Sequence, residues 1–278
     1  MDGNALIAFG LTLFAGLATG LGSLVVFVAR KPNIKLLSFG LGFSGGVMIY
    51  VSLVELLPVG SEMISATLGE GPGGWLGTGC FFGGMALSAL IDKLVPEPAN
   101  PHELVSLGDI LRAHEGEPAP EQSSQVSPQS LQRVGLLTAI VIGLHNFPEG
   151  MATFASGLAD TSLGISIAIA VAIHNIPEGI AVAVPIFFAT GSRRKAFLSS
   201  FGSGLAEPIG ALVVYLVLMP FISDLLVGCL LASVGGIMVF ISFDELLPTA
   251  REYATGHTVI GGIVLGMAVM AASLLLVI

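Results

Sequence analysis

The sequence has very little charge. Only 10% of its 278 residues are charged, whereas an average soluble domain carries about 25%. The mean hydropathy is +0.92, and hydrophobic residues make up 54% of the chain. The ten Lys and Arg are spread over short polar connections and form no patch for nucleic acid. This composition excludes an ordinary soluble protein and predicts an integral protein of the lipid bilayer.

Cysteines and an N-terminal basic segment are also scarce. The chain has two cysteines, Cys80 and Cys229, both in apolar stretches, so we expect no disulfide framework. No basic residue precedes the first apolar stretch, and Arg30 is the first to follow it. This order argues against a cleaved signal peptide, so the first stretch is expected to stay as a membrane helix.

Apolar stretches long enough to cross a bilayer, near 20 residues each, recur along the chain. We therefore expect an all-α polytopic membrane protein whose single transmembrane domain covers residues 1–278. The eight predicted spanning helices are 4–29, 36–58, 72–95, 131–158, 162–189, 196–219, 223–249 and 258–278.

The basic residues predict the orientation. All ten fall in or beside connections on one side of the predicted bundle. They are Arg30, Lys31, Lys35, Lys93, Arg112, Arg133, Arg193, Arg194, Lys195 and Arg251. Because basic loops stay in the cytoplasm, we expect a multi-pass protein of the inner (plasma) membrane with both termini outside. Residues 96–130, rich in proline, serine and glutamate, are then a cytoplasmic, mostly disordered loop.

An internal repeat indicates the architecture. Residues 45–58 align with residues 235–248 over fourteen positions without a gap, and residues 16–22 are similar to 204–210. Matching helices are five crossings apart, an odd number, so the two halves run in opposite directions. The prediction is a 3+2+3 arrangement in which helices 1–3 and 6–8 form an inverted repeat. Inverted repeats are typical of transporters with a site near the bilayer midplane.

The central pair of helices carries a duplicated polar motif. His145-Asn-Phe-Pro-Glu149-Gly recurs 29 residues later as His174-Asn-Ile-Pro-Glu178-Gly. Residues four apart share one face of a helix, so each histidine lies above its own glutamate. Each proline removes a helical hydrogen bond and frees a carbonyl beside the histidine. The two copies offer imidazoles, carboxylates, carboxamides and carbonyls, which are metal ligands.

Acidic side chains inside apolar segments reinforce this interpretation. Each costs about 2.5–3.5 kcal/mol at the bilayer centre on insertion scales, and no Lys or Arg lies at the same depth. A divalent cation or protons must supply the compensating charge. The residues are Glu55, Glu149, Glu178, Glu207, Asp244 and Glu245.

These acids receive different expected roles. Glu207, directly before Pro208, is predicted to be a further metal ligand, and Glu149 and Glu178 are close enough to bridge two ions. Glu55 and Glu245 end their helices before Pro58 and Pro248, at the outer entrance and the cytoplasmic exit respectively. Asp244 is expected to join Glu245 at the exit.

Histidine nitrogen combined with carboxylate oxygen suits zinc, iron, manganese, cobalt or cadmium. The duplicated motif, the Glu207-Pro208 pair and the basic-loop topology together resemble the ZIP family of divalent metal transporters. The resemblance covers all eight predicted helices. It implies an inner bundle of helices two, four, five and seven around a binuclear metal site, and import by an elevator-like movement. The implied metal ligands are His145, Asn146, Glu149, His174, Asn175, Glu178 and Glu207.

The sequence thus predicts a zinc-preferring divalent metal importer in which neither motif copy suffices alone. Many ZIP proteins have a histidine-rich loop between helices three and four, whereas this loop has only His102 and His114. The glycine-rich helix faces would permit a homodimer.

Two alternatives remain open. An intramembrane metalloprotease would need a His-Glu-x-x-His helix, and neither motif copy has the second histidine. A proton-coupled carrier of an organic solute would use the buried carboxylates as relays but leaves the histidines and asparagines without a role. Bound metal in the purified protein would separate the two transporter hypotheses.

Overall fold

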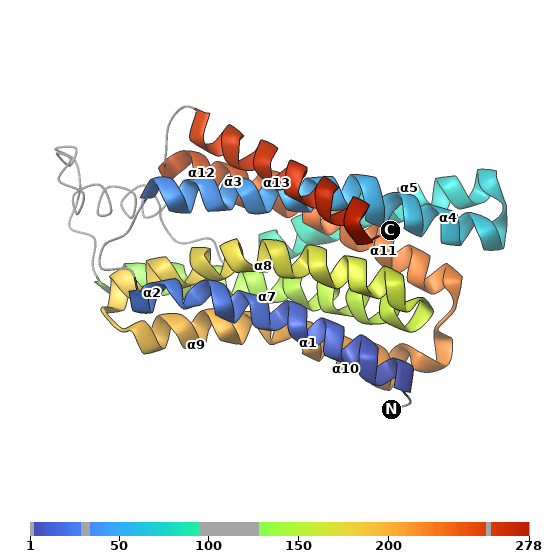
Figure 1. Ribbon diagram of the computed structural model, residues 1–278, viewed down its shortest axis with the longest axis horizontal. Coiled ribbons are helices and arrows are strands. Elements are labelled where there is room, and N and C mark those ends of the chain that lie inside the picture. Colours follow the sequence, from blue (N-terminus) through green and yellow to red (C-terminus); the bar gives the residue numbers. More distant parts are fainter. Residues whose placement is uncertain (1–2, 29–33, 95–127, 254–256, 278) are drawn as a thin grey trace.

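The computed structural model describes residues 3–28, 34–94, 128–253 and 257–277 (Figure 1). Within these ranges the regular structure is entirely helical. The α-helices are α1 (Gly3–Ser23), α2 (Val25–Val28), α3 (Ile34–Val51), α4 (Leu57–Leu68), α5 (Glu70–Leu94), α7 (Pro128–Ala159), α8 (Thr161–Thr190), α9 (Arg193–Gly204), α10 (Ala206–Val213), α11 (Asp224–Ile241), α12 (Leu247–Tyr253) and α13 (His257–Val277).

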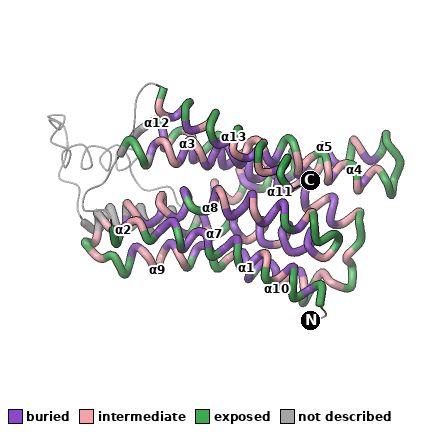
Figure 2. Tube along the Cα trace, in the orientation of Figure 1, coloured by how far each residue is buried: buried purple, intermediate pink, exposed green. Residues whose placement is uncertain are grey.

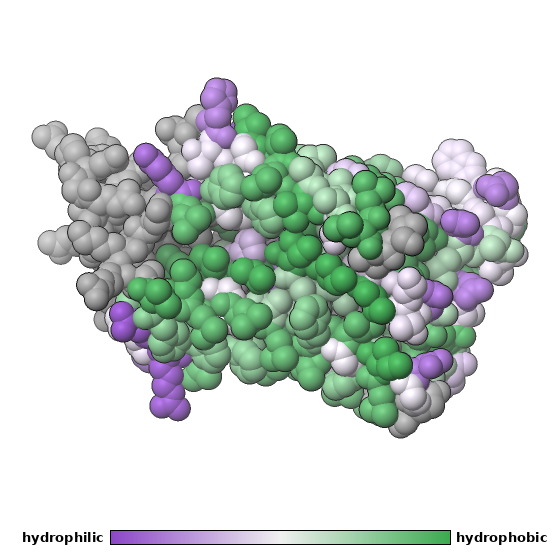
Figure 3. All heavy atoms as spheres, in the orientation of Figure 1, coloured by the Kyte–Doolittle hydropathy of each residue, from purple (hydrophilic) through white to green (hydrophobic). Residues whose placement is uncertain are grey.

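Seven helical stretches of the described residues are long and apolar enough to cross a membrane. They are Gly3–Val28, Ser38–Leu68, Glu70–Lys93, Thr161–Val184, Arg193–Phe221, Asp224–Arg251 and His257–Leu276. The prediction of an all-α, multi-pass membrane protein is therefore confirmed. Figure 3 shows the matching surface, with hydrophobic residues across the middle of the visible face and hydrophilic residues toward its two ends.

The eighth predicted span, 131–158, falls on α7, which is not one of the seven. α7 carries one copy of the polar motif and α8 carries the other, and α8 is among the seven, so the motif by itself does not account for this difference. Helix α7 begins at Pro128, so the last residues of the predicted loop 96–130 are helical. The rest of that loop, residues 96–127 with His102 and His114, lies outside the described residues.

The prediction that helices end before Pro58 and Pro248 is wrong. Wide π-helical turns at Ser52–Leu56 and Ser242–Leu246 carry the chain through, and α4 and α12 continue beyond them. A proline has no N–H for the ordinary helical bond, and a wider turn is a known way to absorb that loss. The two turns occupy equivalent positions of the fourteen-residue repeat, so its two copies have the same local structure.

The predicted helix 196–219 is interrupted. α9 ends at Gly204 and α10 begins at Ala206, with Leu205 between them. Pro208 cannot donate to the carbonyl of Gly204, which explains a break at this point. A π-helical turn and a 3₁₀ turn then complete the segment up to Phe221.

The helices pack as two groups. The motif group comprises α1, α2 and α7–α10, in the lower half of Figure 1, and includes both His-Asn motifs. The repeat group comprises α3–α5 and α11–α13, in the upper half, and includes both copies of the fourteen-residue repeat. Between the groups, α3 packs on α8 and α11 packs on α7.

Glycines bring helices within each group into very close contact. A Cβ on Gly150 of α7 would overlap the backbone of Glu207 in α10, and one on Gly179 of α8 would overlap the backbone of Thr19 in α1. In the repeat group, Gly84 of α5 meets the backbone of Ser233 in α11 in the same way. Among the described glycines, no such overlap crosses from one group to the other.

The inner and outer helices differ in burial. In the spans of α8 and α11, 72% and 67% of the most apolar window is buried, against 22% and 28% in those of α5 and α13. Figure 2 shows the buried residues concentrated toward the inside of the helix bundle. The helices with the motifs and the second repeat copy are therefore those shielded from lipid by their neighbours.

Candidate metal centre

The two motifs lie on neighbouring helices of a tight hairpin. α7 and α8 are joined through Asp160, whose side chain accepts a 2.8 Å hydrogen bond from the N–H of Leu163 and caps α8. Both helices continue through their motif prolines. The six motif side chains expected to ligate metal are all buried, with 4% or less of each exposed.

The histidines and glutamates of the two copies form crossed pairs. His145 Nε2 lies 3.6 Å from Glu178 Oε2, and His174 Nε2 lies 3.4 Å from Glu149 Oε2. Each histidine therefore faces the carboxylate of the other helix, whereas the i, i+4 spacing had placed it above the carboxylate of its own. The contacts combine both copies into one cluster.

His174 is held in the tautomer of a metal ligand. Its Nδ1 lies 3.0 Å from the carbonyl oxygen of Ala170. A carbonyl only accepts hydrogen bonds, so Nδ1 must donate, and Nε2 of the neutral ring then carries a lone pair. That lone pair is directed at a carboxylate oxygen of Glu149, which is favourable only with a proton or a metal ion between them. Metal-bound histidines typically have this second bond to a carbonyl or carboxylate.

Buried polar atoms without a hydrogen-bond partner are concentrated at the same place. The described residues contain nine such side-chain atoms, and eight belong to six of the seven predicted ligands. The eight are Nδ1 and Nε2 of His145, Oδ1 of Asn146, Oε1 of Glu149, Oδ1 of Asn175, both carboxylate oxygens of Glu178 and Oε2 of Glu207. Such atoms are rare in folded proteins because each is costly to bury, and a cation or protons at this cluster would satisfy several of them.

Both asparagines are anchored through nitrogen. Asn146 Nδ2 donates to the carbonyl of Ser203 at 3.4 Å, and Asn175 Nδ2 donates to the carbonyl of Ala15 at 2.9 Å and to Glu207 Oε1. The amide oxygens remain available as ligands. Glu207 is therefore placed on the Asn175 side of the cluster, and its recorded side-chain partner is the amide rather than a histidine.

The cluster is not a finished coordination shell as it stands. No three His, Cys, Asp or Glu side chains of the described ranges are placed to hold one metal ion. The ligands are instead arranged as two pairs, with Glu207 hydrogen-bonded to Asn175 beside them. Binding of an ion would require the pairs to separate and turn toward it.

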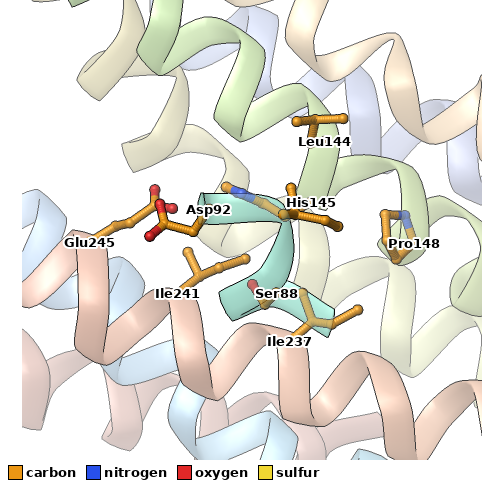
Figure 4. A pocket seen from close by; sticks show the side chains of 9 residues that line it. Ser88, Asp92, Leu144, His145, Pro148, Ile237, Ile241 and Glu245 are labelled. Atoms are coloured by element: carbon orange, nitrogen blue, oxygen red, sulfur yellow. The ribbon is translucent and has the colours of Figure 1, made fainter. Parts of the chain in front are cut away.

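A pocket adjoins one side of the cluster (Figure 4). His145, Leu144 and Pro148 of α7 line it together with residues of α5, α11 and the π-helical turn that follows α11. Figure 4 shows Glu245 and Asp92 at the same end of the pocket as the His145 ring. Glu245 was expected on the exit route, and it is half-buried here.

Asp92 is the residue that the sequence did not reveal. It lies at the end of α5 beside Lys93, where an acid is ordinarily a solvated helix-end residue. Its position in the predicted membrane segment was the only available signal. The tertiary structure places it in the same pocket as His145 and Glu245.

A second, smaller pocket lies on the other side of the cluster. Apart from Glu149, its lining is apolar, and it includes Val51, Val171, Val234 and Met238. Glu55, in the first π-helical turn, is half-buried, and Asp244, in the second, is exposed. Neither is among the residues that line these two pockets.

Comparisons with known proteins give matches over nearly the full length of the chain. The family model described as ZIP zinc transporter matches residues 3–274. The chain is 56% identical to the zinc transporter ZupT of Lysinibacillus sphaericus, with all of both chains covered. It is 54% identical to ZupT of Oceanobacillus iheyensis over 98% of each chain. It is also 52% identical to ZupT of Clostridium perfringens over 98% of this chain and 96% of the relative.

A family match over nearly the full length, together with relatives above half identity, does not depend on any one motif. It also excludes the protease alternative, because the family consists of transporters and not of enzymes. The protein belongs to the ZIP family of zinc transporters.

Proposed function

We propose that this protein imports zinc, and less selectively other divalent cations, through the His/Asn/Glu cluster of α7, α8 and α10. The observation that carries the proposal is the group of eight unpartnered buried atoms on the predicted ligands. A divalent cation would satisfy several of these atoms at once. The names of the relatives, zinc transporters that are 52–56% identical to this chain, support zinc as the main substrate.

The crossed pairs suggest how an ion is held. His174 presents a lone pair on Nε2, and Glu149 and Glu178 present carboxylate oxygens from opposite helices. An ion inserted between a histidine and its paired carboxylate replaces an unfavourable contact with two metal bonds. Since each pair provides such a position, two ions bridged by the carboxylates are compatible with the cluster. Iron, manganese, cobalt and cadmium accept the same ligands.

An elevator-like movement of the motif group against the repeat group is the proposed mechanism. The tight glycine contacts stay within each group, so each group can move as a unit without separating backbones that touch. α3 and α11, which belong to the two repeat copies, run in opposite directions in Figure 1, as an inverted repeat requires. Transporters with inverted repeats alternate by rocking or sliding one unit against the other.

The proposed direction is toward the cytoplasm. The pocket beside His145 lies between the C-terminal parts of α5 and α11, on the side where the last turns of α5 and α12 carry Lys93 and Arg251. Basic connections mark the cytoplasmic side, so both termini lie outside and this conformation is accessible from inside the cell. Glu245 then lies on the exit route, with Asp244 nearby, and Glu55 on the outer side at the entrance.

Uptake into proteoliposomes tests the proposal. Purified protein should accumulate zinc in vesicles, and the double variant His145→Ala/His174→Ala should reduce uptake to that of protein-free vesicles. Elemental analysis of the purified protein should find zinc in the wild type and less in the variant. Wild-type uptake that persists in the double variant would overturn the proposed site. A metal-free wild type with intact binding of an organic solute would favour the proton-coupled carrier instead.

A further inference from the structure

Ser44 of α3 donates a hydrogen bond to another helix, as the buried Ser38 and Ser200 also do, but its bond joins the two helix groups whereas theirs stay within one group. Ser52, Ser156 and Ser242 each donate to the carbonyl four residues earlier in the same helix, at 2.6–2.7 Å. Ser44 is fully buried, and its hydroxyl lies 3.3 Å from the carbonyl oxygen of His174 in α8 and 3.9 Å from Sδ of Met48 in α3. The carbonyl oxygen is the stronger of these two acceptors, because a thioether sulfur accepts only weakly. This bond connects the repeat group to the backbone of a metal-ligand residue in the motif group.

Most polar contacts near the cluster remain inside one group. Asn146 and Asn175 bond to residues of α1, α9 and α10, and Ser200 of α9 bonds to the carbonyl of Gly179 in α8 at 3.0 Å. The glycine overlaps also remain inside the groups. The Ser44 bond therefore crosses a boundary to which these asparagine, serine and glycine contacts of the described residues do not contribute, so this one hydrogen bond has a large relative effect there.

The second copy of the repeat has no such donor. The alignment of residues 45–58 with 235–248 places Val234 opposite Ser44. Val234 lines the apolar pocket with Glu149, whereas Ile237 and Ile241, one and two turns further along α11, line the pocket with His145. The α11 residues that border the pocket with His145 therefore lie one to two helical turns beyond the position equivalent to Ser44, or about 5–11 Å along the helix.

We propose that Ser44 is a positioning residue, which holds α8 against α3 in the inward-accessible state through its bond to the His174 carbonyl. Val234, at the equivalent position of α11, has no hydroxyl, so the outward-accessible state lacks the corresponding bond. In an inverted repeat, the α3–α8 interface of one state takes the helix alignment that the α11–α7 interface has in the other state, and the reverse. The exchange would separate Ser44 from His174 and bring Val234 next to His145. The sequence difference between Ser44 and Val234 then biases the resting protein toward the conformation seen here. This inference rests on the proposed alternating movement.

The test measures access to the pocket beside His145. Ser88 lines this pocket, so a Ser88→Cys reporter can be labelled with a water-soluble thiol reagent in inside-out vesicles. The two native cysteines, Cys80 and Cys229, are replaced by alanine in this background. Ser44→Ala should lower the ratio of accessible to protected reporter about fivefold, the equivalent of about 1 kcal/mol for one buried hydrogen bond. Val234→Ser should lower the same ratio by adding a bond to the opposite state.

Three further variants test whether a changed labelling ratio is due to the Ser44 hydrogen bond. Ser44→Thr retains the hydroxyl and should restore the labelling ratio, and Ser156→Ala removes a serine whose bond stays within its own helix and should leave the ratio unchanged. If Ser44→Ala does not fold, as judged by gel filtration, Val234→Ser tests the same asymmetry independently. Unchanged labelling in either folded variant would overturn the proposal.

Labelling without metal also separates this inference from the transport proposal. A shifted ratio in Ser44→Ala together with absent zinc uptake by the wild type would retain the role of Ser44 and overturn the proposed function. Normal zinc uptake by the wild type together with an unshifted labelling ratio in Ser44→Ala would retain the proposed function and overturn the role of Ser44. Failure of the Ser44 proposal and failure of the transport proposal therefore give different experimental results.

Discussion

The first and second copies of the His-Asn motif have nearly the same sequence and different surroundings. In the first copy, His145 lines a pocket with Asp92 and Glu245, and neither of its ring nitrogens has a hydrogen-bond partner. In the second copy, His174 is fully buried, and its ring is fixed by the carbonyl of Ala170. Its own carbonyl accepts the bond from Ser44.

This difference predicts unequal roles for the two copies of the motif in binding an ion. The second copy is pre-oriented on a helix that is held from both sides, so it is suited to fix the position of an ion. The first copy faces the pocket with an unanchored imidazole, so it is suited to receive or release the ion. A symmetric sequence motif thus becomes an asymmetric centre because α3 and α11 contact the two motif helices in different registers.

The largest expected effect is a difference between the two histidines in zinc affinity. His174→Ala should weaken zinc binding about 100-fold and His145→Ala about tenfold, because orienting partners of a metal-bound histidine contribute about 10–100-fold in affinity. Isothermal titration of each purified variant measures the two dissociation constants. Asn146→Ala, which removes a ligand of the first copy, provides a reference for the loss of a weaker ligand. Equal weakening by the two histidine variants would contradict the asymmetry.

A smaller effect concerns stability, in which the two copies should be alike. Gly150→Ala and Gly179→Ala each place a methyl group against the backbone of a neighbouring helix. Each should lower the free energy of unfolding by about 1–3 kcal/mol, the usual cost of overpacking. Thermal unfolding in detergent measures the change.

Gly83→Ala is the matched control, because nothing lies within 4 Å of an added Cβ at that position of α5. It should leave the melting temperature unchanged or raise it slightly, since alanine favours a helix over glycine. A stable Gly150→Ala together with an unstable Gly179→Ala would show that the asymmetry of the centre extends to its packing.

The smallest effect is expected at the pocket. Asp92→Asn should slow zinc uptake about threefold and leave zinc affinity at the centre unchanged, because Asp92 acts on the route beside His145 and, being half-exposed, contributes within the range of about 0.2–1 kcal/mol. Initial uptake rates and titration on the same preparation separate the two quantities. Asp224→Asn, at the start of α11, is the control. A loss of affinity in Asp92→Asn would place this acid in the centre itself.

Most of the fold could be predicted from the sequence because it depends on local properties. The length of apolar stretches decides which segments span a membrane, and seven such stretches were found where they were expected. The predicted helix ends at Pro58 and Pro248 were wrong because a π-helical turn can absorb the missing N–H of a proline. No residue pattern used in the sequence analysis predicts such a turn. The orientation of the termini and the inverted arrangement of the two halves stay predictions.

The sequence identified the residues that cluster in the candidate site but not how they pair, and their role as metal ligands stays a prediction. All seven predicted ligands are buried, and they lie on α7, α8 and α10. The pairing of His145 with Glu178, and of His174 with Glu149, arises only when two helices pack against each other. The partner of Glu207 and the place of Asp92 in the pocket likewise depend on helices that are distant in sequence.

The sequence by itself determined a membrane protein with too few basic residues to neutralise its buried acids, and two motifs whose side chains are of the kinds that bind metal. Those conclusions follow from side-chain chemistry and helical periodicity, which are properties of single segments. The tertiary structure decided which histidine faces which carboxylate, which motif borders the pocket and which serine crosses between the helix groups. These depend on the register of one helix against another, which is set by packing between segments and is not encoded in either one alone.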